Sequence, residues 1–308
     1  KVFSGGVSGV ALQGLWGFID LAGDWAVEPS YEAVLDYSEG LAAVRRAGLW
    51  GFISSSGELA IPYAFQDVMS FSEGTAGAAS QGRWGYIDRR GAWMADPVYL
   101  EAWPFSEGLA PVRSASNGRW GYVGRSIPPL FGGRSFEEAG TFADGLALVG
   151  EGAKKRYIDV QGRDAFEGMF ADARDFSEGL AAVLSGGKTL FIDKKGNAVI
   201  RGNFIPWTGE APRFRWGVAC LETSKGRWRY VNRGGRYIGE PPVGSVDSAS
   251  GSVPGILPYR SDTGAWGYRN MDGTVVVPPF LDAARPFREG MAAVSLGGRW
   301  WYIAEPKR

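Results

Sequence analysis

Histidine is missing from the 308-residue sequence, and cysteine occurs once, as Cys220. Without histidine the chain has no His-based metal site, no Ser-His-Asp triad and no Cys-His dyad, because each of these needs an imidazole. A single cysteine forms no disulfide within the chain, and it identifies neither an oxidising nor a reducing compartment. We therefore expect no catalytic residues, no metal and no cofactor, and the sequence leaves the localisation open.

Charge of one sign and long apolar stretches are also lacking. Lys and Arg together number 33, as do Asp and Glu, so the formal net charge is +0. A neutral chain produces no field that attracts nucleic acid or an anionic membrane, and its short apolar runs fall far below the roughly 20 residues that span a bilayer. We expect neither a nucleic-acid partner nor a membrane span. The chain opens on Lys1 without a signal-like segment, which indicates a processed product or a piece of a longer protein.

One aromatic phrase, in contrast, is repeated along the whole chain. GLWGFID begins at residue 14, and its relatives GLWGFIS, GRWGYID and GRWGYVG begin at 48, 82 and 118. The tryptophan of the phrase is kept in seven units, while Lys155 and Thr189 replace it in two others. Two positions after it stands an aromatic residue, and nine such residues follow one another at intervals of 34 to 39: Phe18, Phe52, Tyr86, Tyr122, Tyr157, Phe191, Tyr230, Tyr268 and Tyr302.

Each unit has the pattern of a β-hairpin followed by a further strand. A glycine stands two positions before the tryptophan, as in SQGRW and SNGRW, where hairpin turns require positive φ. Before the turn glycine of each hairpin lies a second phrase, such as FSEGLAPV at 105 or FSEGLAAV at 176. After it comes a short apolar segment with a proline (Pro29, Pro62, Pro97, Pro278), which we expect to form a third strand at the sheet edge because proline does not donate into a ladder. The connection YEAVLDY at 31 is a candidate for a short turn of helix.

Both faces of the predicted hairpins are apolar, so each hairpin needs a neighbour on either side. Units of about 34 residues that bury their faces only against each other are typical of repeat proteins. The sequence therefore predicts an all-β tandem array over residues 1–308 as a single domain, with hairpins centred near 16, 50, 84, 120, 155, 189, 228, 266 and 300. Nine units exceed the four to eight blades usual in propellers, which favours an open, curved superhelix. A closed β-propeller is the alternative.

The joint recurrence of SEGLA, glycine and WGYID at near-constant spacing resembles the bacterial WG-repeat, or KWG-repeat, proteins over essentially the whole chain. The resemblance implies a β-rich, non-catalytic interaction module. It implies no specific ligand.

The recurring acidic residues are predicted to serve turns rather than catalysis. A glycosidase needs two carboxylates that converge on one bond, whereas these residues recur at equivalent positions in several units. Such side chains commonly accept hydrogen bonds from local backbone N–H groups. The positions concerned are Asp20, Asp88, Asp159, Asp193, Glu39, Glu73, Glu107, Glu178 and Glu289.

The motif tryptophans are predicted to be packing residues, and a binding surface is predicted where the pattern fails. Trp216 stands where other units place the glutamate of SEG, and the longest intervals fall in the same region. Trp and Arg are favoured in binding hot spots. The hypothetical surface comprises Trp207, Arg213, Arg215, Trp216 and the loop 244–255 with Asp247. Simple decay of the repeat, or a loop unrelated to binding, is the competing interpretation.

Together these features predict a non-enzymatic scaffold that binds a protein or peptide through its curved face or loop rim. A lectin-like module, with aromatic residues stacking on glycans, is the alternative. A hydrolase that uses loop carboxylates is the weakest of the three.

Overall fold

The computed structural model describes residues 1, 3–126, 130–207, 212–214, 217–224, 227–239, 256–261, 263–270, 274–285, 287 and 290–306. They fall into two compact units, Lys1–Ala165 and Phe166–Arg308. The expectation of one domain over residues 1–308 stays a prediction. Among the described residues, no helix has the length and apolarity to cross a membrane.

The first unit is built from strands and one short helix. The 3-10 helix η1 covers Phe131–Gly133. The strands are β1 (Val7–Leu12), β2 (Leu15–Asp20), β3 (Trp25–Tyr31), β4 (Ala33–Val34), β5 (Leu41–Arg46), β6 (Leu49–Ser54), β7 (Leu59–Phe65), β8 (Asp67–Val68), β9 (Thr75–Ser80), β10 (Arg83–Asp88), β11 (Trp93–Tyr99), β12 (Glu101–Ala102), β13 (Leu109–Arg113), β14 (Trp120–Gly124), β15 (Glu138–Ala139), β16 (Leu146–Glu151) and β17 (Lys154–Asp159).

The second unit continues the same succession. Its strands are β18 (Asp172–Ala173), β19 (Leu180–Ser185), β20 (Lys188–Asp193), β21 (Ala198–Ile200), β22 (Val218–Ser224), β23 (Arg227–Asn232), β24 (Tyr237–Gly239), β25 (Ile256–Arg260), β26 (Trp266–Asn270), β27 (Val275–Leu281), β28 (Ala283–Ala284), β29 (Met291–Leu296) and β30 (Arg299–Ala304).

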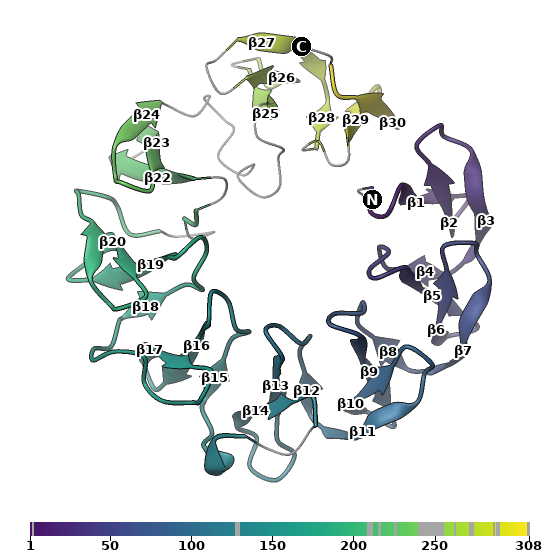
Figure 1. The fold of residues 1–308 in the computed structure, drawn as a ribbon. Helices are drawn as coiled ribbons and strands as arrows, with labels where there is room; N and C mark the ends of the chain where they lie inside the picture. Colours follow the sequence, from purple (N-terminus) through teal and green to yellow (C-terminus); the bar gives the residue numbers. More distant parts are fainter. Residues whose placement is uncertain are drawn as a thin grey trace. The chain divides into compact units, whose positions relative to one another are not determined.

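The described residues form nine small antiparallel sheets, and each sheet contains one of the nine predicted hairpins. Figure 1 shows the hairpins following one another along each unit. The predicted all-β tandem array is confirmed. We number the repeats one to nine after these hairpins, so that the fourth contains Trp120 and the fifth contains Tyr157.

The hairpin turns have the backbone that the glycine pattern predicted. Between β5 and β6, Ala47 and Gly48 adopt φ values of 49° and 79°. Two consecutive positive φ values match the turn that suits the right-handed twist of a two-residue hairpin. The first of the two turn positions need not be glycine, because a residue such as Ala47 adopts the left-handed region at a modest cost.

The predicted third strand lies at the edge of its sheet. In the second repeat the strand order is β4-β5-β6-β7, and β7 carries Pro62 on the outside of β6. A bulge in β7 brings its backbone close to the glycine of the WG pair: a Cβ on Gly51 would lie 2.7 Å from the carbonyl oxygen of Ile61. The small residue is therefore required for close approach of the third strand.

A fourth, two-residue strand on the opposite edge was not expected. In the segment YEAVLDY, residues Ala33–Val34 form β4 and pair with β5, so the expectation of a helical turn there is wrong. Val34 is buried. Ala33 packs against the core of the second repeat. Two paired residues are too few to show the alternation by which a strand is recognised in a sequence.

The core is formed mainly by the aromatic residue two positions after the tryptophan. Phe52 packs edge-on against Phe71 of the next repeat, with ring centroids 4.9 Å apart. The tryptophans are buried unequally: Trp50 is 9% exposed, whereas Trp300 is 54% exposed. The prediction that the motif tryptophans are packing residues is thus correct for Trp50 and wrong for Trp300. The buried marker aromatics are Phe18, Phe52, Tyr86, Tyr122, Tyr157, Phe191 and Tyr268.

Polar contacts between the SEG turns of successive repeats join the repeats further. The hydroxyl of Ser72 donates to the carbonyl oxygen of Phe105 at 2.8 Å, and Oε2 of Glu73 accepts the N–H of Gly108 at 2.8 Å. The same serine contact recurs from Ser4, Ser38, Ser106 and Ser177. The same glutamate contact recurs from Glu39, Glu107 and Glu178.

Candidate functional site

The fourth repeat departs from the third first in its hairpin turn, a departure shared by the eighth repeat, in which β25 ends at Arg260 and β26 begins at Trp266. Residues 114–119 separate β13 from β14, whereas only residues 81–82 separate β9 from β10 in the third repeat. The longer turn is closed by the N–H of Ser114, which donates to the carbonyl oxygen of Arg119 at 2.9 Å. Asn117 accepts the N–H of Arg119 through Oδ1 at 3.0 Å. The turn therefore extends the end of β14 with ordered polar residues.

The second departure is a wider bulge opposite β14. The N–H of Leu130 donates to the carbonyl oxygen of Tyr122, and Trp120 forms a bridge with Phe136. Leu130 and Phe136, the two residues that pair with β14, are six positions apart along the chain. The matching residues of the third repeat, Ala95 and Tyr99, are four positions apart. The two extra residues make room for the helix η1, which replaces the flat bulge of β11.

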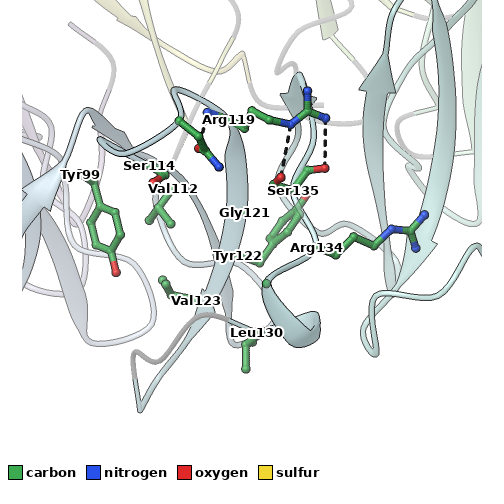
Figure 2. A pocket seen from close by; sticks show the side chains of 12 residues that line it. Tyr99, Val112, Ser114, Arg119, Gly121, Tyr122, Val123, Leu130, Arg134 and Ser135 are labelled. Atoms are coloured by element: carbon green, nitrogen blue, oxygen red, sulfur yellow. Dashed lines mark hydrogen bonds between the residues drawn. The ribbon is translucent and has the colours of Figure 1, made fainter.

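A small cavity results where the wider bulge no longer covers the WG glycine (Figure 2). Among the described residues, the nearest atom to a Cβ built on Gly121 is the carbonyl oxygen of Arg134, at 3.8 Å. A Cβ on Gly85 in the third repeat would lie 2.9 Å from the nitrogen of Pro97. The cavity has a volume of about 170 Å³, and its apolar walls are Tyr99, Val112, Val123 and Leu130. We call this cavity the fourth-repeat pocket.

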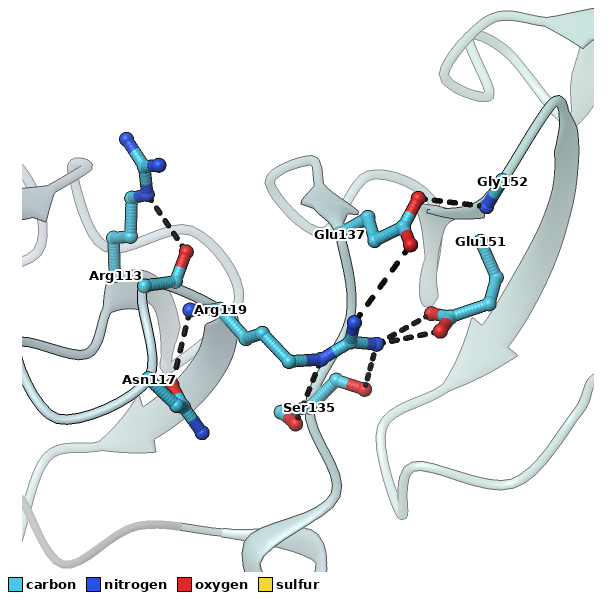
Figure 3. Close-up of polar contacts among 8 residues, drawn as sticks. Arg113, Asn117, Arg119, Ser135, Glu137, Glu151 and Gly152 are labelled. Atoms are coloured by element: carbon cyan, nitrogen blue, oxygen red, sulfur yellow. Dashed lines mark hydrogen bonds and ion pairs between the residues drawn. The ribbon is translucent and has the colours of Figure 1, made fainter.

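Arg119 lies at the rim of the pocket and is held by the next repeat (Figure 3). Its Nη2 donates to Oε1 and Oε2 of Glu151 at 2.6 and 2.7 Å, and its Nη1 lies 3.8 Å from Oε1 of Glu137. Its Nε donates to the hydroxyl of Ser135 at 3.3 Å. The hydrogen bond from Arg119 holds the pKa of Glu151 below its ordinary value. The guanidinium charge is therefore already compensated.

Arg134, on the other side of the rim, is compensated in the same way. Its Nη2 donates to Oδ1 of Asp164 at 2.7 Å, and its Nη1 donates to the carbonyl oxygen of Gly162 at 2.7 Å. Burial raises the pKa of Tyr99 in the pocket wall, so the phenol stays neutral at pH 7. A pocket with apolar walls and paired charges suits a neutral occupant rather than an anion.

The residues of the sequence-predicted binding surface are only partly described. Trp207 is half-buried: its Nε1 donates to Oδ2 of Asp172 at 3.2 Å, and Arg174 lies over its ring at 5.2 Å. It also packs against the core that contains Phe204. Arg213 is exposed. Arg215, Trp216, Asp247 and the loop 244–255 lie outside the described residues, so this surface stays a prediction.

Trp207 packs near a hairpin that lacks the motif tryptophan. Thr189 stands at the tryptophan position, and its hydroxyl donates to the carbonyl oxygen of Ile205 at 2.8 Å, two residues before Trp207. The indole reaches this core from a segment outside the hairpin.

The described acidic residues act in turns, as predicted, but the glutamates act at longer range than expected; Glu289 lies outside the described residues. Oδ1 of Asp88 accepts the N–H groups of Arg90 and Ala92 at 2.8 and 2.9 Å, which is a local turn contact. Glu73 instead accepts the N–H of Gly108 in the following repeat. Within the described part of the chain, no three acidic or cysteine side chains come together as a metal site.

Comparison of the sequence with family models decides the family. A model described as WG containing repeat matches residues 16–50, 50–80, 84–123, 156–188 and 266–300, which is more than half of the chain. The chain belongs to the WG-repeat family. The WG-repeat matches leave residues 124–155 uncovered, and this stretch holds η1 and the wide bulge of the fourth repeat. No curated protein matches the WG-repeat chain.

Two solved structures with little sequence similarity share the fold, and a third has a lower TM-score. The eukaryotic initiation factor is 11% identical, with 91% of this chain and 86% of that chain covered and a TM-score of 0.57. The computationally designed Ika8 protein is 13% identical, with 98% and 95% covered and a TM-score of 0.50. BamB from Moraxella catarrhalis is 12% identical, with 88% and 95% covered and a TM-score of 0.49. At these identities the likeness concerns the fold alone.

Proposed function

We propose that this WG-repeat chain is a non-catalytic scaffold that binds a protein or peptide, and that the fourth-repeat pocket is a point of contact. The observation that carries the proposal is the pocket itself, which exists because two local insertions meet at Gly121. In an array where the third strand covers the corresponding glycine of four other repeats, an opening with ordered walls is a site for a partner rather than a requirement of the fold.

The engagement of the recurring carboxylates supports a non-catalytic role. Glu39, Glu73, Glu107 and Glu178 each accept a backbone N–H of the next repeat, and Asp88 and Asp193 each accept two N–H groups of their own turn. Carboxylates used in this way hold turns together. A hydrolase needs a pair placed on either side of a bond, with one member kept protonated.

Peptide display against the immobilised full chain tests the proposal. We expect saturable enrichment of peptides that then bind at one site per chain in calorimetry. A glycan array run on the same preparation is the counter-test. Failure to enrich any peptide, together with glycan binding at several sites per chain, would replace the scaffold by a lectin-like module.

A further inference from the structure

We infer that the fourth-repeat pocket binds a proline residue in an extended segment of a partner protein. This inference rests on the proposed scaffold function and names the chemistry of its partner. It comes from what the same chain places over the corresponding glycine in its other repeats.

In four other repeats a proline-containing backbone fills the space that is open above Gly121. A Cβ on Gly17 would lie 2.7 Å from the nitrogen of Pro29, and one on Gly51 would lie 3.1 Å from the carbonyl carbon of Pro62. In the third repeat, a Cβ on Gly85 would lie 2.9 Å from the nitrogen of Pro97. In the eighth repeat, a Cβ on Gly267 would lie 2.9 Å from both the carbonyl carbon of Pro278 and the nitrogen of Pro279. The fold therefore recognises an extended segment that runs into proline at this position.

The backbone hydrogen bonds around the pocket favour an occupant without an N–H group. The groups of β14 on either side of Gly121 are already used, since Trp120 pairs with Phe136 and Tyr122 accepts the N–H of Leu130. A residue that brought its own N–H into the pocket would need a further acceptor there. Proline brings none, and its φ is already fixed in the extended region.

The walls and the size of the pocket agree with this occupant. Tyr99, Val112, Val123 and Leu130 present a ring and aliphatic groups to a saturated pyrrolidine, and proline-rich segments generally dock on aromatic-lined surfaces. The volume of about 170 Å³ lies below the roughly 300–1,000 Å³ of drug-sized ligand sites, so it suits a single side chain. The charges of Arg119 and Arg134 are paired with Glu151 and Asp164, which removes any preference for an acidic residue.

The test uses a random nine-residue peptide library displayed against the full chain and against the Gly121→Leu variant. Gly121 has no positive φ, and the nearest atom to its Cβ is 3.8 Å away, so a larger side chain fills the pocket without straining the backbone. Val98→Leu is the matched control, because Val98 is exposed on β11 outside the pocket. Gly121→Ala, which adds a single methyl group, is a second filling variant, and thermal unfolding checks that every variant is folded.

We expect the peptides that are lost on Gly121→Leu, and kept on Val98→Leu, to share a proline at one position. Replacement of that proline by alanine should weaken binding by about tenfold or more, and Gly121→Ala should weaken binding of the proline peptide by a smaller factor. Two outcomes overturn the inference while leaving the scaffold function standing. One is a set of pocket-dependent peptides without a fixed proline, and the other is a set of peptides whose binding is unchanged by Gly121→Leu. If no peptide is enriched on any variant, the scaffold proposal and this inference fail together.

Discussion

Glu73 accepts, through its Oε2, the backbone N–H of Gly108 at 2.8 Å, so a turn of one repeat is completed by a carboxylate from the repeat before it. The side chain is 28% exposed and also lies 3.4 Å from Nη2 of Arg125. Glu73 therefore links residues that are far apart in sequence, and its removal tests how strongly the repeats depend on one another.

Glu73→Ala is expected to lower the free energy of unfolding by about 1–2 kcal/mol. Hydrogen bonds to charged groups contribute about 1.5–3 kcal/mol, and partial exposure reduces the value. Glu73→Gln keeps an acceptor without the charge and should lose about half as much. Urea denaturation is the measurement, with Glu58→Ala on the exposed end of its turn as the control. Equal stability of Glu73→Ala and Glu58→Ala would show that the turn-to-turn contact contributes nothing.

The two glycines Gly85 and Gly121 occupy the same repeat position but have different surroundings. Gly85→Ala should destabilise the protein by about 1–3 kcal/mol, because the new Cβ would clash with the backbone of Ala95 and Asp96 in β11. Gly121→Ala should stay within about 0.5 kcal/mol of the parent chain, since its Cβ enters the pocket. Denaturant midpoints of the two variants, compared in one experiment, check the difference. Equal losses of stability in Gly85→Ala and Gly121→Ala would mean that the bulge of the fourth repeat closes over Gly121.

The Arg119–Glu151 pair predicts a pH dependence. Because its hydrogen bond with Arg119 holds the pKa of Glu151 below the ordinary value of 4.5, the pair stabilises the folded chain at pH values above that ordinary value. The contribution is lost as the pH falls through the lowered pKa. We expect the parent chain to be more stable than Glu151→Gln at pH 7 and the difference to shrink on acidification below about pH 4.5. A difference that stays constant from pH 7 to pH 3 would contradict the role of ionised Glu151.

The thiol of Cys220 should react slowly in the folded protein. Burial in β22 raises its pKa to about 12, and the thiolate is the reactive form. At pH 8 we expect its reaction with a disulfide reagent to be slower than in urea by a factor of about 100 or more. The chain contains no other cysteine, so the absorbance change reports this residue alone. Reaction at equal rates with and without urea would show that the thiol is accessible and ionises normally.

Much of the scaffold was predictable from the sequence because it depends on local patterns that recur. Gly48 at positive φ, Pro62 on an edge strand and Phe52 in the core all follow from residue type and from the nine-fold repetition. The strand Ala33–Val34 was not predictable, because two paired residues carry no periodicity. The hydrogen bond from the N–H of Gly108 to Glu73 was not predicted, because the two residues are a whole repeat apart along the chain. Turn chemistry suggested instead that Glu73 accepts an N–H of its own turn.

The fourth-repeat pocket was missed although the sequence contains a signal for it. The interval from Tyr86 to Tyr122 is 36 residues instead of 34, which corresponds to the longer turn before Trp120. The wide bulge leaves a weaker mark, because the connection before Leu130 is one residue shorter and partly compensates for its length, so that the interval from Tyr122 to Tyr157 is 35 residues. The largest intervals fall near Trp216, where the sequence predicts the binding surface, and in that region Trp207 packs against the core that contains Phe204.

The turn contacts have a consequence for how such a chain grows. The second, third, fourth and sixth repeats each supply a serine hydroxyl and a carboxylate to the next repeat, which offers a carbonyl oxygen and an N–H in return. A duplication of one full period, begun at any residue, therefore copies a matched set of donors and acceptors and needs no newly evolved interface. A gene for this kind of protein can lengthen by simple copying, and changes within a single copy, such as the longer turn and wider bulge of the fourth repeat, then give that copy a surface of its own.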